Sequence, residues 1–121
     1  MSADTIRLRN MRFYAYHGLF DEEAQLGQRF EIDLELQSDL RQAGLKDDLN
    51  LSIDYSTVYK TVAEIVTQQR FKLIEALAEH IAAQIGRTYA PIALVVRVRK
   101  PNPPVPGDFD GIEVEIQRQY E

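Results

Sequence analysis

The sequence predicts an α+β domain, in which a four-stranded antiparallel sheet is covered on one face by two antiparallel helices in the order ββααββ. Three observations predict this architecture. Residues alternate between apolar and polar near both ends of the chain, the middle of the chain has helical periodicity, and the two helical segments are joined by a very short link. A length of 121 residues fits one domain, which we expect to span residues 1–121.

The first two strands differ in how regularly they alternate. In TIRLRNMRFYAY the apolar positions change phase near Asn10, which predicts a β-bulge in the first strand. In RFEIDLELQSD the alternation is continuous, with acids on the other side, so we expect a half-buried second strand. The apolar positions of this strand are Phe30, Ile32, Leu34 and Leu36.

Two helices follow a polar connection. The first is expected from about Tyr55 to Arg70, with Asp54 or Ser56 as its N-cap, because valines and isoleucines recur at helical spacing. The second is expected to begin near Leu73 and to close near Gly86.

The last two strands are ALVVRVRK and GIEVEIQRQ, joined by a proline-rich loop. If strands two and three are neighbours, the acids of strand two face the arginines of strand three. Strands one and four are then edges, with Arg7 and Arg9 on one and Glu113 and Glu115 on the other. Such complementary edges predict pairing with another chain.

Composition excludes several classes of function. The net charge is −5 and the basic residues are scattered, which argues against a nucleic-acid partner. With no cysteine and two histidines, we expect no metal site and no cofactor. No apolar run approaches the ~18 residues of a membrane span, and MSADTIRLRN lacks the apolar core of a secretory signal. A cytoplasmic location is the simplest inference.

Two ionisable positions and one acidic loop are candidates for chemistry. Lys100 ends the third strand in phase with its inward residues, so it is either a lysine whose ammonium reaches water or an acid/base group with a pKa lowered by partial burial. The loop YHGLFDEEAQLGQ, which contains Glu22 and Glu23, is either a solvated acidic loop or a functional one. Glu75 lies at the border of the apolar stripe of its helix, where it is either a first-turn charge or a group that binds a ligand. No capping residue precedes this helix, so its first N–H groups are available to a ligand.

Four segments together resemble the dihydroneopterin aldolases of folate biosynthesis, over nearly the whole chain. They are YAYHGLFDEEAQLGQRFEIDLEL, DDLNLSIDYSTV, FKLIEALAEHIA and VRKPNPPVPGDFDGIEVEI. The resemblance implies the tunnelling fold, in which subunits join edge strands into an oligomeric barrel with active sites between subunits. It therefore implies a homo-oligomer, either a tetrameric ring or an octamer.

The resemblance also implies an activity and a set of residues. The activity is metal-free cleavage of a pterin, 7,8-dihydroneopterin, into 6-hydroxymethyl-7,8-dihydropterin and glycolaldehyde, with side-chain epimerisation as a second activity. Glu75 and the backbone of Ile74 match the pterin anchor, and Lys100 matches the catalytic lysine. Glu23 matches the loop glutamate, with its neighbour Glu22 as the alternative, and Tyr55 matches a tyrosine from a neighbouring subunit.

Two other functions are compatible with the sequence. A dihydroneopterin triphosphate epimerase would share the fold and the bond cleavage but would recombine the fragments, and it would need cations that this acidic chain does not obviously offer. A non-catalytic, ring-forming pterin-binding protein would explain the edge charges but not the combination of Glu75, Tyr55 and Lys100.

Overall fold

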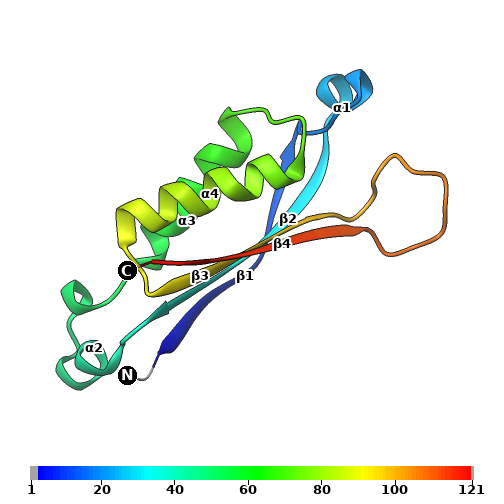
Figure 1. The fold of residues 1–121 in the computed structure, drawn as a ribbon. Helices are drawn as coiled ribbons and strands as arrows, with labels where there is room; N and C mark the ends of the chain where they lie inside the picture. The colour runs from blue at the N-terminus through cyan, green and yellow to red at the C-terminus, as the bar shows by residue number, and fades with distance from the viewer. Residues whose placement is uncertain (1–2, 121) are drawn as a thin grey trace.

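The computed structural model describes residues 3–120, so Met1, Ser2 and Glu121 of the predicted domain lie outside the described residues (Figure 1). The predicted ββααββ order is confirmed by β1 (Asp4–Ala15), β2 (Gln28–Ser38), α3 (Tyr55–Gln68), α4 (Ile74–Tyr89), β3 (Ala93–Lys100) and β4 (Ile112–Gln119). Shorter helices lie in the two connections before α3: α1 (Asp21–Leu26), α2 (Arg41–Lys46) and the 3-10 turn η1 (Leu49–Leu51).

The sheet is antiparallel with the strand order β1-β2-β3-β4, so β1 and β4 are the edges, as predicted. The register of β1 against β2 shifts between Leu8 and Met11, which confirms the bulge. Asn10 occupies the bulge with φ of 53°, and its N–H donates to Asp33 Oδ1 at 2.6 Å. Asparagine tolerates this left-handed conformation better than most residues, so the bulge is fixed by local sequence and by one cross-strand bond.

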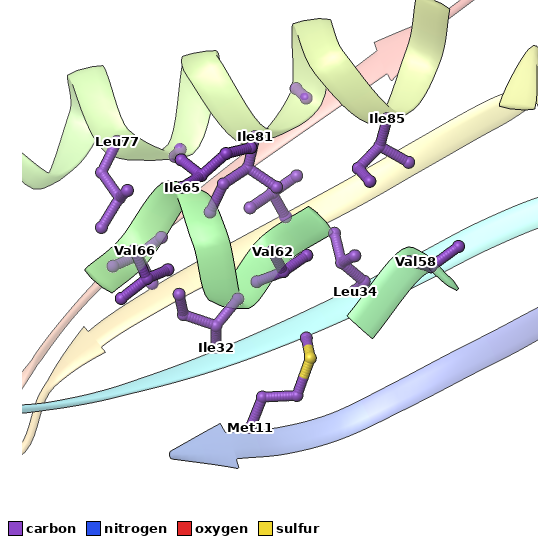
Figure 2. Packing of buried hydrophobic residues seen from close by; sticks show 14 of the residues in the cluster. Met11, Ile32, Leu34, Val58, Val62, Ile65, Val66, Leu77, Ile81 and Ile85 are labelled. Carbon is purple, nitrogen blue, oxygen red and sulfur yellow. The ribbon is translucent and has the colours of Figure 1, made fainter. Parts of the chain in front are cut away.

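The hydrophobic core lies between one face of the sheet and the helix pair α3–α4 (Figure 1). Inward side chains of β2, such as Ile32 and Leu34, meet Val62, Leu77 and Ile81 of the helices (Figure 2). These five side chains are fully buried, and each such burial contributes about 1.5 to 3 kcal/mol to folding. The core therefore holds the ends of α4 and β3 at fixed positions relative to each other.

Both long helices end differently from the prediction. The first stops at Gln68 rather than Arg70, because Gln69 is extended and Arg70 turns toward the β1–β2 connection. The second passes Gly86 and ends at Tyr89, where Ala90 adopts a left-handed conformation and donates its N–H to the Gly86 carbonyl. Gly86 is an interior helical position at which the Tyr120 ring packs, and a Cβ there would overlap that ring.

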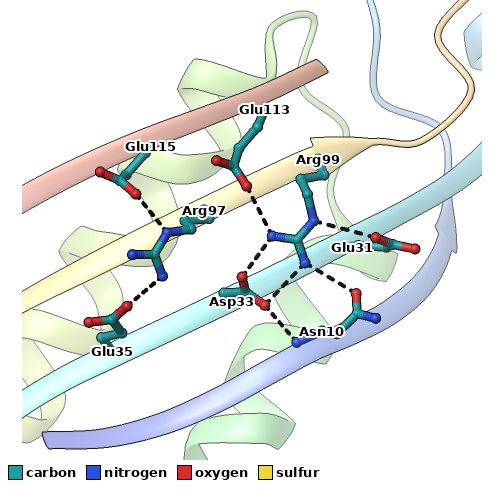
Figure 3. A network of polar contacts seen from close by, with 8 residues as sticks. All are labelled: Asn10, Glu31, Asp33, Glu35, Arg97, Arg99, Glu113 and Glu115. Carbon is teal, nitrogen blue, oxygen red and sulfur yellow. Dashed lines mark hydrogen bonds and ion pairs between the residues drawn. The ribbon is translucent and has the colours of Figure 1, made fainter. Parts of the chain in front are cut away.

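The outer face of the sheet carries a network of ion pairs (Figure 3). The Arg99 guanidinium contacts Asp33 at 2.7 Å and Glu113 at 3.1 Å, and this holds the pKa of the Asp33 carboxyl below its usual value. Arg97 binds Glu35 and Glu115, each at 2.6 Å.

This network changes one expectation about the edges. Glu113 and Glu115 pair with arginines of their own chain, whereas the sequence suggested Arg7 and Arg9 of another chain as their partners. Charge complementarity alone therefore does not account for pairing between β1 and β4 of different copies.

Candidate active site

A cavity of about 250 Å³ lies at the end of the sheet where β3 ends and α4 begins. It brings together four residues predicted from the sequence: Glu23, Ile74, Glu75 and Lys100. Its remaining lining residues come from the β1–β2 connection, the link before α4, the proline-rich loop and β4. They are Leu19, Phe20, Lys72, Leu73, Pro103, Pro104, Val105, Ile112 and Val114.

Glu23 and Lys100 form a buried ion pair in this cavity. Lys100 Nζ donates to Glu23 Oε2 at 2.7 Å, and the two side chains are only 13% and 6% exposed. Gln28 Nε2 donates to the same oxygen at 2.7 Å, and the Phe20 N–H donates to Glu23 Oε1 at 3.2 Å. Burial alone would raise the pKa of Glu23, but these hydrogen bonds outweigh it and the pKa is lowered. The cavity therefore holds a fixed carboxylate against the end of Lys100.

The short helix α1 decides which loop acid faces the cavity. Glu23 is buried, while its neighbour Glu22 is exposed. Gly18 makes this burial sterically feasible, because it lies against the Glu23 carboxylate and a Cβ at that position would overlap it. The geometry thus agrees with the choice of Glu23 over Glu22.

The start of α4 forms another wall of the cavity. Ile74 is buried and Glu75 is exposed in the single chain, so Glu75 is less covered than its place at the border of the apolar stripe suggested. The N-cap residue Leu73 supplies no side-chain hydrogen bond, so this helix of 16 residues begins without a side-chain cap. At such a site a carboxylate can accept hydrogen bonds from a planar ligand, and the uncapped N–H groups can donate to the same ligand.

Tyr55 does not lie in this cavity. It is 64% exposed at the start of α3, and it lines an open hollow of about 770 Å³ along β1, together with Asn10, Met11 and Tyr59. Asp54, one of the two predicted N-caps, caps α3 by accepting from the Ser56 N–H at 3.0 Å and from its hydroxyl at 2.7 Å. Within one chain, the structure therefore separates Tyr55 from the other four predicted residues.

A buried histidine, which the sequence did not single out, ties the β1–β2 connection to the link between α3 and α4. His17 Nδ1 accepts from the Phe71 N–H at 3.0 Å, so the ring proton is on Nε2, which lies 2.8 Å from the Val66 carbonyl. The Gly18 N–H also donates to the Phe71 carbonyl at 3.0 Å. His17 is fully buried, and burial, helped by the positive charges of Arg70 and Lys100, lowers its pKa despite the Val66 carbonyl.

Replacing His17 with phenylalanine is expected to lower the free energy of unfolding at neutral pH by about 2 to 4 kcal/mol, because the Phe71 N–H and the Val66 carbonyl lose their partner. The variant should also lose part of the pH dependence. In the parent chain, His17 stays neutral when folded but gains a proton when unfolded as pH falls below about 6.5, so stability falls in that range. Denaturant unfolding at pH 7.5 and pH 5.5 measures both effects.

His80 provides the matched control for this prediction. It is exposed and contacts the Phe71 ring, with 5.3 Å between ring centroids, so His80→Gln should keep most of the loss of stability at acidic pH. If His17→Phe retained the full pH dependence of the parent chain, the role assigned to His17 would be wrong.

Within residues 3–120, no three His, Asp or Glu side chains are grouped as ligands of a metal ion would be. In the same described range, no helix is long and apolar enough to cross a membrane. The side chains of the cavity offer hydrogen bonds and charge, through the Glu23–Lys100 pair and Glu75.

Comparison with known proteins relates the chain to one protein family. The family model for dihydroneopterin aldolase matches residues 6–117. A dihydroneopterin aldolase from Bacillus subtilis is 42% identical over 117 residues, covering 96% of this chain and 98% of the relative. A crystal structure from Vibrio cholerae described as a dihydroneopterin aldolase is 34% identical, with a TM-score of 0.93, covering 99% of this chain and all of that one. A Burkholderia thailendensis dihydroneopterin aldolase solved bound to guanine is 28% identical, with a TM-score of 0.81, covering 98% of this chain and 93% of that one.

Proposed function

Because this chain belongs to the dihydroneopterin aldolase family, whose activity is that of a lyase, we propose that it cleaves 7,8-dihydroneopterin into 6-hydroxymethyl-7,8-dihydropterin and glycolaldehyde. One structural observation connects this activity to the cavity. The cavity combines the buried Glu23–Lys100 pair with the uncapped start of α4, where Glu75 stands. The pair provides a group for proton transfer, and the helix start provides a place to bind the ring.

The ring-binding role of Glu75 follows from the shape of a pterin. The pyrimidinone edge presents a ring N–H next to an exocyclic NH2, and one carboxylate can accept both in a bidentate contact. The N–H of Ile74, in the uncapped first turn, can donate to an acceptor of the same ring. Guanine, which is bound to the Burkholderia thailendensis relative, presents the same N–H and NH2 edge, and this supports the assignment.

The reaction needs an acceptor for an electron pair, and the substrate provides it. Lys100 takes the proton of the side-chain hydroxyl next to the bond that breaks, either directly or through a water, with Tyr55 of a neighbouring copy beside it. The carbon–carbon bond then breaks, glycolaldehyde leaves, and the electron pair enters the ring C=N bond as an enamine. Return of the proton to the enamine carbon yields the hydroxymethyl product. Glu23 holds Lys100 Nζ in place through the 2.7 Å hydrogen bond between them.

A homo-oligomer is part of this proposal, because Tyr55 lies away from the cavity within one chain. The Tyr55 hollow runs along the β1 edge, while Ile112 and Val114 of the other edge, β4, line the cavity. Pairing β1 of one copy with β4 of the next would therefore bring the hollow and the cavity together. We propose a ring closed in this way, as a tetramer or as an octamer of two rings.

Mixing two inactive variants is expected to restore activity if sites are shared between copies. Tyr55→Phe and Glu75→Ala chains, dissociated and reassociated at equal concentration, should form about a quarter of their sites with both original residues, by random pairing. Turnover before and after mixing measures this recovery, with each variant treated alone as the control. A fully active monomer, shown by sedimentation at the assay concentration, would rule out shared sites.

Product identification tests the function itself. Purified protein incubated with 7,8-dihydroneopterin should release glycolaldehyde and 6-hydroxymethyl-7,8-dihydropterin in equal amounts. A dihydroneopterin triphosphate epimerase would recombine the fragments and release no glycolaldehyde, and a ring-forming binding protein would bind the pterin without turnover. The cytoplasmic location and side-chain epimerisation stay predictions.

A further inference from the structure

We propose that Arg70 is a positioning residue for this reaction, which holds the loop carrying Glu23 against the link that leads into α4. The proposal rests on the proposed function, because it assigns Arg70 an effect on turnover through the Glu23–Lys100 pair. Arg70 does not line the cavity. Its effect must therefore pass through the backbone to which it binds.

The contacts of Arg70 are with backbone rather than with acids. Its Nε donates to the Tyr16 carbonyl at 3.0 Å and its Nη2 donates to the Gly18 carbonyl at 2.9 Å. Among the ion pairs of residues 3–120, none involves Arg70. A guanidinium directed at two carbonyls fixes a backbone geometry, because its planar fork offers two donors in fixed directions.

The two segments that Arg70 joins lead directly to opposite walls of the site. Gly18 lies against the Glu23 carboxylate, so the position of the Gly18 backbone limits where that carboxylate can lie. Four residues after Arg70, Ile74 opens the first turn of α4. Arg70 thus sets the spacing between the acid/base pair and the ring-binding wall.

The loop is the less firmly held of the two segments. The first turn of α4 is anchored by Ile74 and Leu77, which are buried in the core. The loop instead exposes its large apolar side chains, with Leu19 at 63%, Phe20 at 53% and Leu26 at 72%. Loss of Arg70 should therefore displace Glu23, the partner of Lys100, more than Glu75, and should reduce turnover more than pterin affinity.

A double-mutant cycle tests the proposal in the full-length protein. Arg70→Met should lower kcat about tenfold while the dissociation constant for the pterin product changes less than about twofold. In a Glu23→Gln background, the same substitution should lower kcat less than about twofold, because the group on which Arg70 acts is already altered. Arg70→Lys, which can reach one carbonyl at a time, should give an intermediate kcat.

Arg87 provides the matched control, since it is an exposed arginine that donates to Gln84 Oε1 of its own helix at 3.4 Å. Arg87→Met should leave kcat unchanged. An equal fall in kcat in both backgrounds, or no fall in either, would overturn the role of Arg70. If Arg70→Met fails to fold, the same cycle with Arg70→Lys decides the question. If the parent protein releases no glycolaldehyde, the proposed function fails first, and the role of Arg70 fails with it.

Discussion

Replacing Lys100 with alanine is expected to lower turnover of 7,8-dihydroneopterin by about 10²-fold or more, with little change in affinity for the pterin product. The reason is that an acid/base group acts mainly in the transition state, whereas the ring is held at the start of α4. Lys100 is 13% exposed and its ammonium contacts Glu23 at 2.7 Å, and among the ion pairs of residues 3–120 no other lysine contacts that carboxylate. Steady-state kinetics and product titration measure the two quantities separately.

The stability of the Lys100 variant must be measured alongside its activity, because the Glu23 carboxylate would be left buried without its cation. Lys100→Gln keeps a hydrogen-bond donor near Glu23 and separates loss of chemistry from loss of fold. Lys46→Ala, at an exposed position in α2, is the control. Borohydride should trap no adduct, and a trapped imine on Lys100 would replace this mechanism with Schiff-base chemistry.

Replacing Glu75 with alanine is expected to weaken pterin binding by at least about 10²-fold, since each charge-assisted hydrogen bond to the ring is worth about 1.5 to 3 kcal/mol. The fold should survive, because Glu75 is exposed in the single chain and is not part of the hydrophobic core. Quenching of pterin fluorescence measures the affinity, and thermal unfolding measures the stability.

Two variants of the same helix sharpen this experiment. Glu75→Gln keeps the shape but removes the charge and one acceptor, so its affinity should fall between those of the parent chain and Glu75→Ala. Glu79→Ala removes a carboxylate one turn further along, where Glu79 pairs with Arg118 outside the cavity, and should bind normally. Near-normal pterin affinity in Glu75→Ala would refute the assignment of Glu75 as the ring anchor.

The main elements of the fold could be predicted because the apolar residues of each recur with a regular period along the sequence. Alternation located the four strands and the bulge at Asn10, and helical spacing located α3 and α4. The helices α1 and α2 have six residues each, which is too short for a period to be visible. The predicted end of α4 at Gly86 was wrong because a glycine that usually ends helices serves here to admit the Tyr120 ring.

The site could be predicted only in part, for a related reason. Lys100 and Glu75 were located by their positions on a strand and a helix, and the family resemblance added Tyr55 and selected Glu23 from the acidic loop. The distance of Tyr55 from the cavity is a matter of which elements meet, and local spacing does not contain that information. His17 and Arg70 were missed because their partners are backbone groups between 49 and 54 residues away, which no sequence pattern identifies.

The tie between the two connections limits how this chain can vary in length. Surface loops commonly accept insertions, since few contacts depend on their length. Here, residues 16–18 and 66–71 are joined by hydrogen bonds at fixed positions. An added residue in either segment would shift that segment relative to the other and break some of these hydrogen bonds. The proline-rich loop differs, because the one backbone hydrogen bond recorded within residues 101–110 joins Val105 to Pro103. Inserted sequence, such as a tag or a reporter, should therefore be kept away from both tied segments, and in the proline-rich loop it should also avoid residues 103–105, which line the cavity.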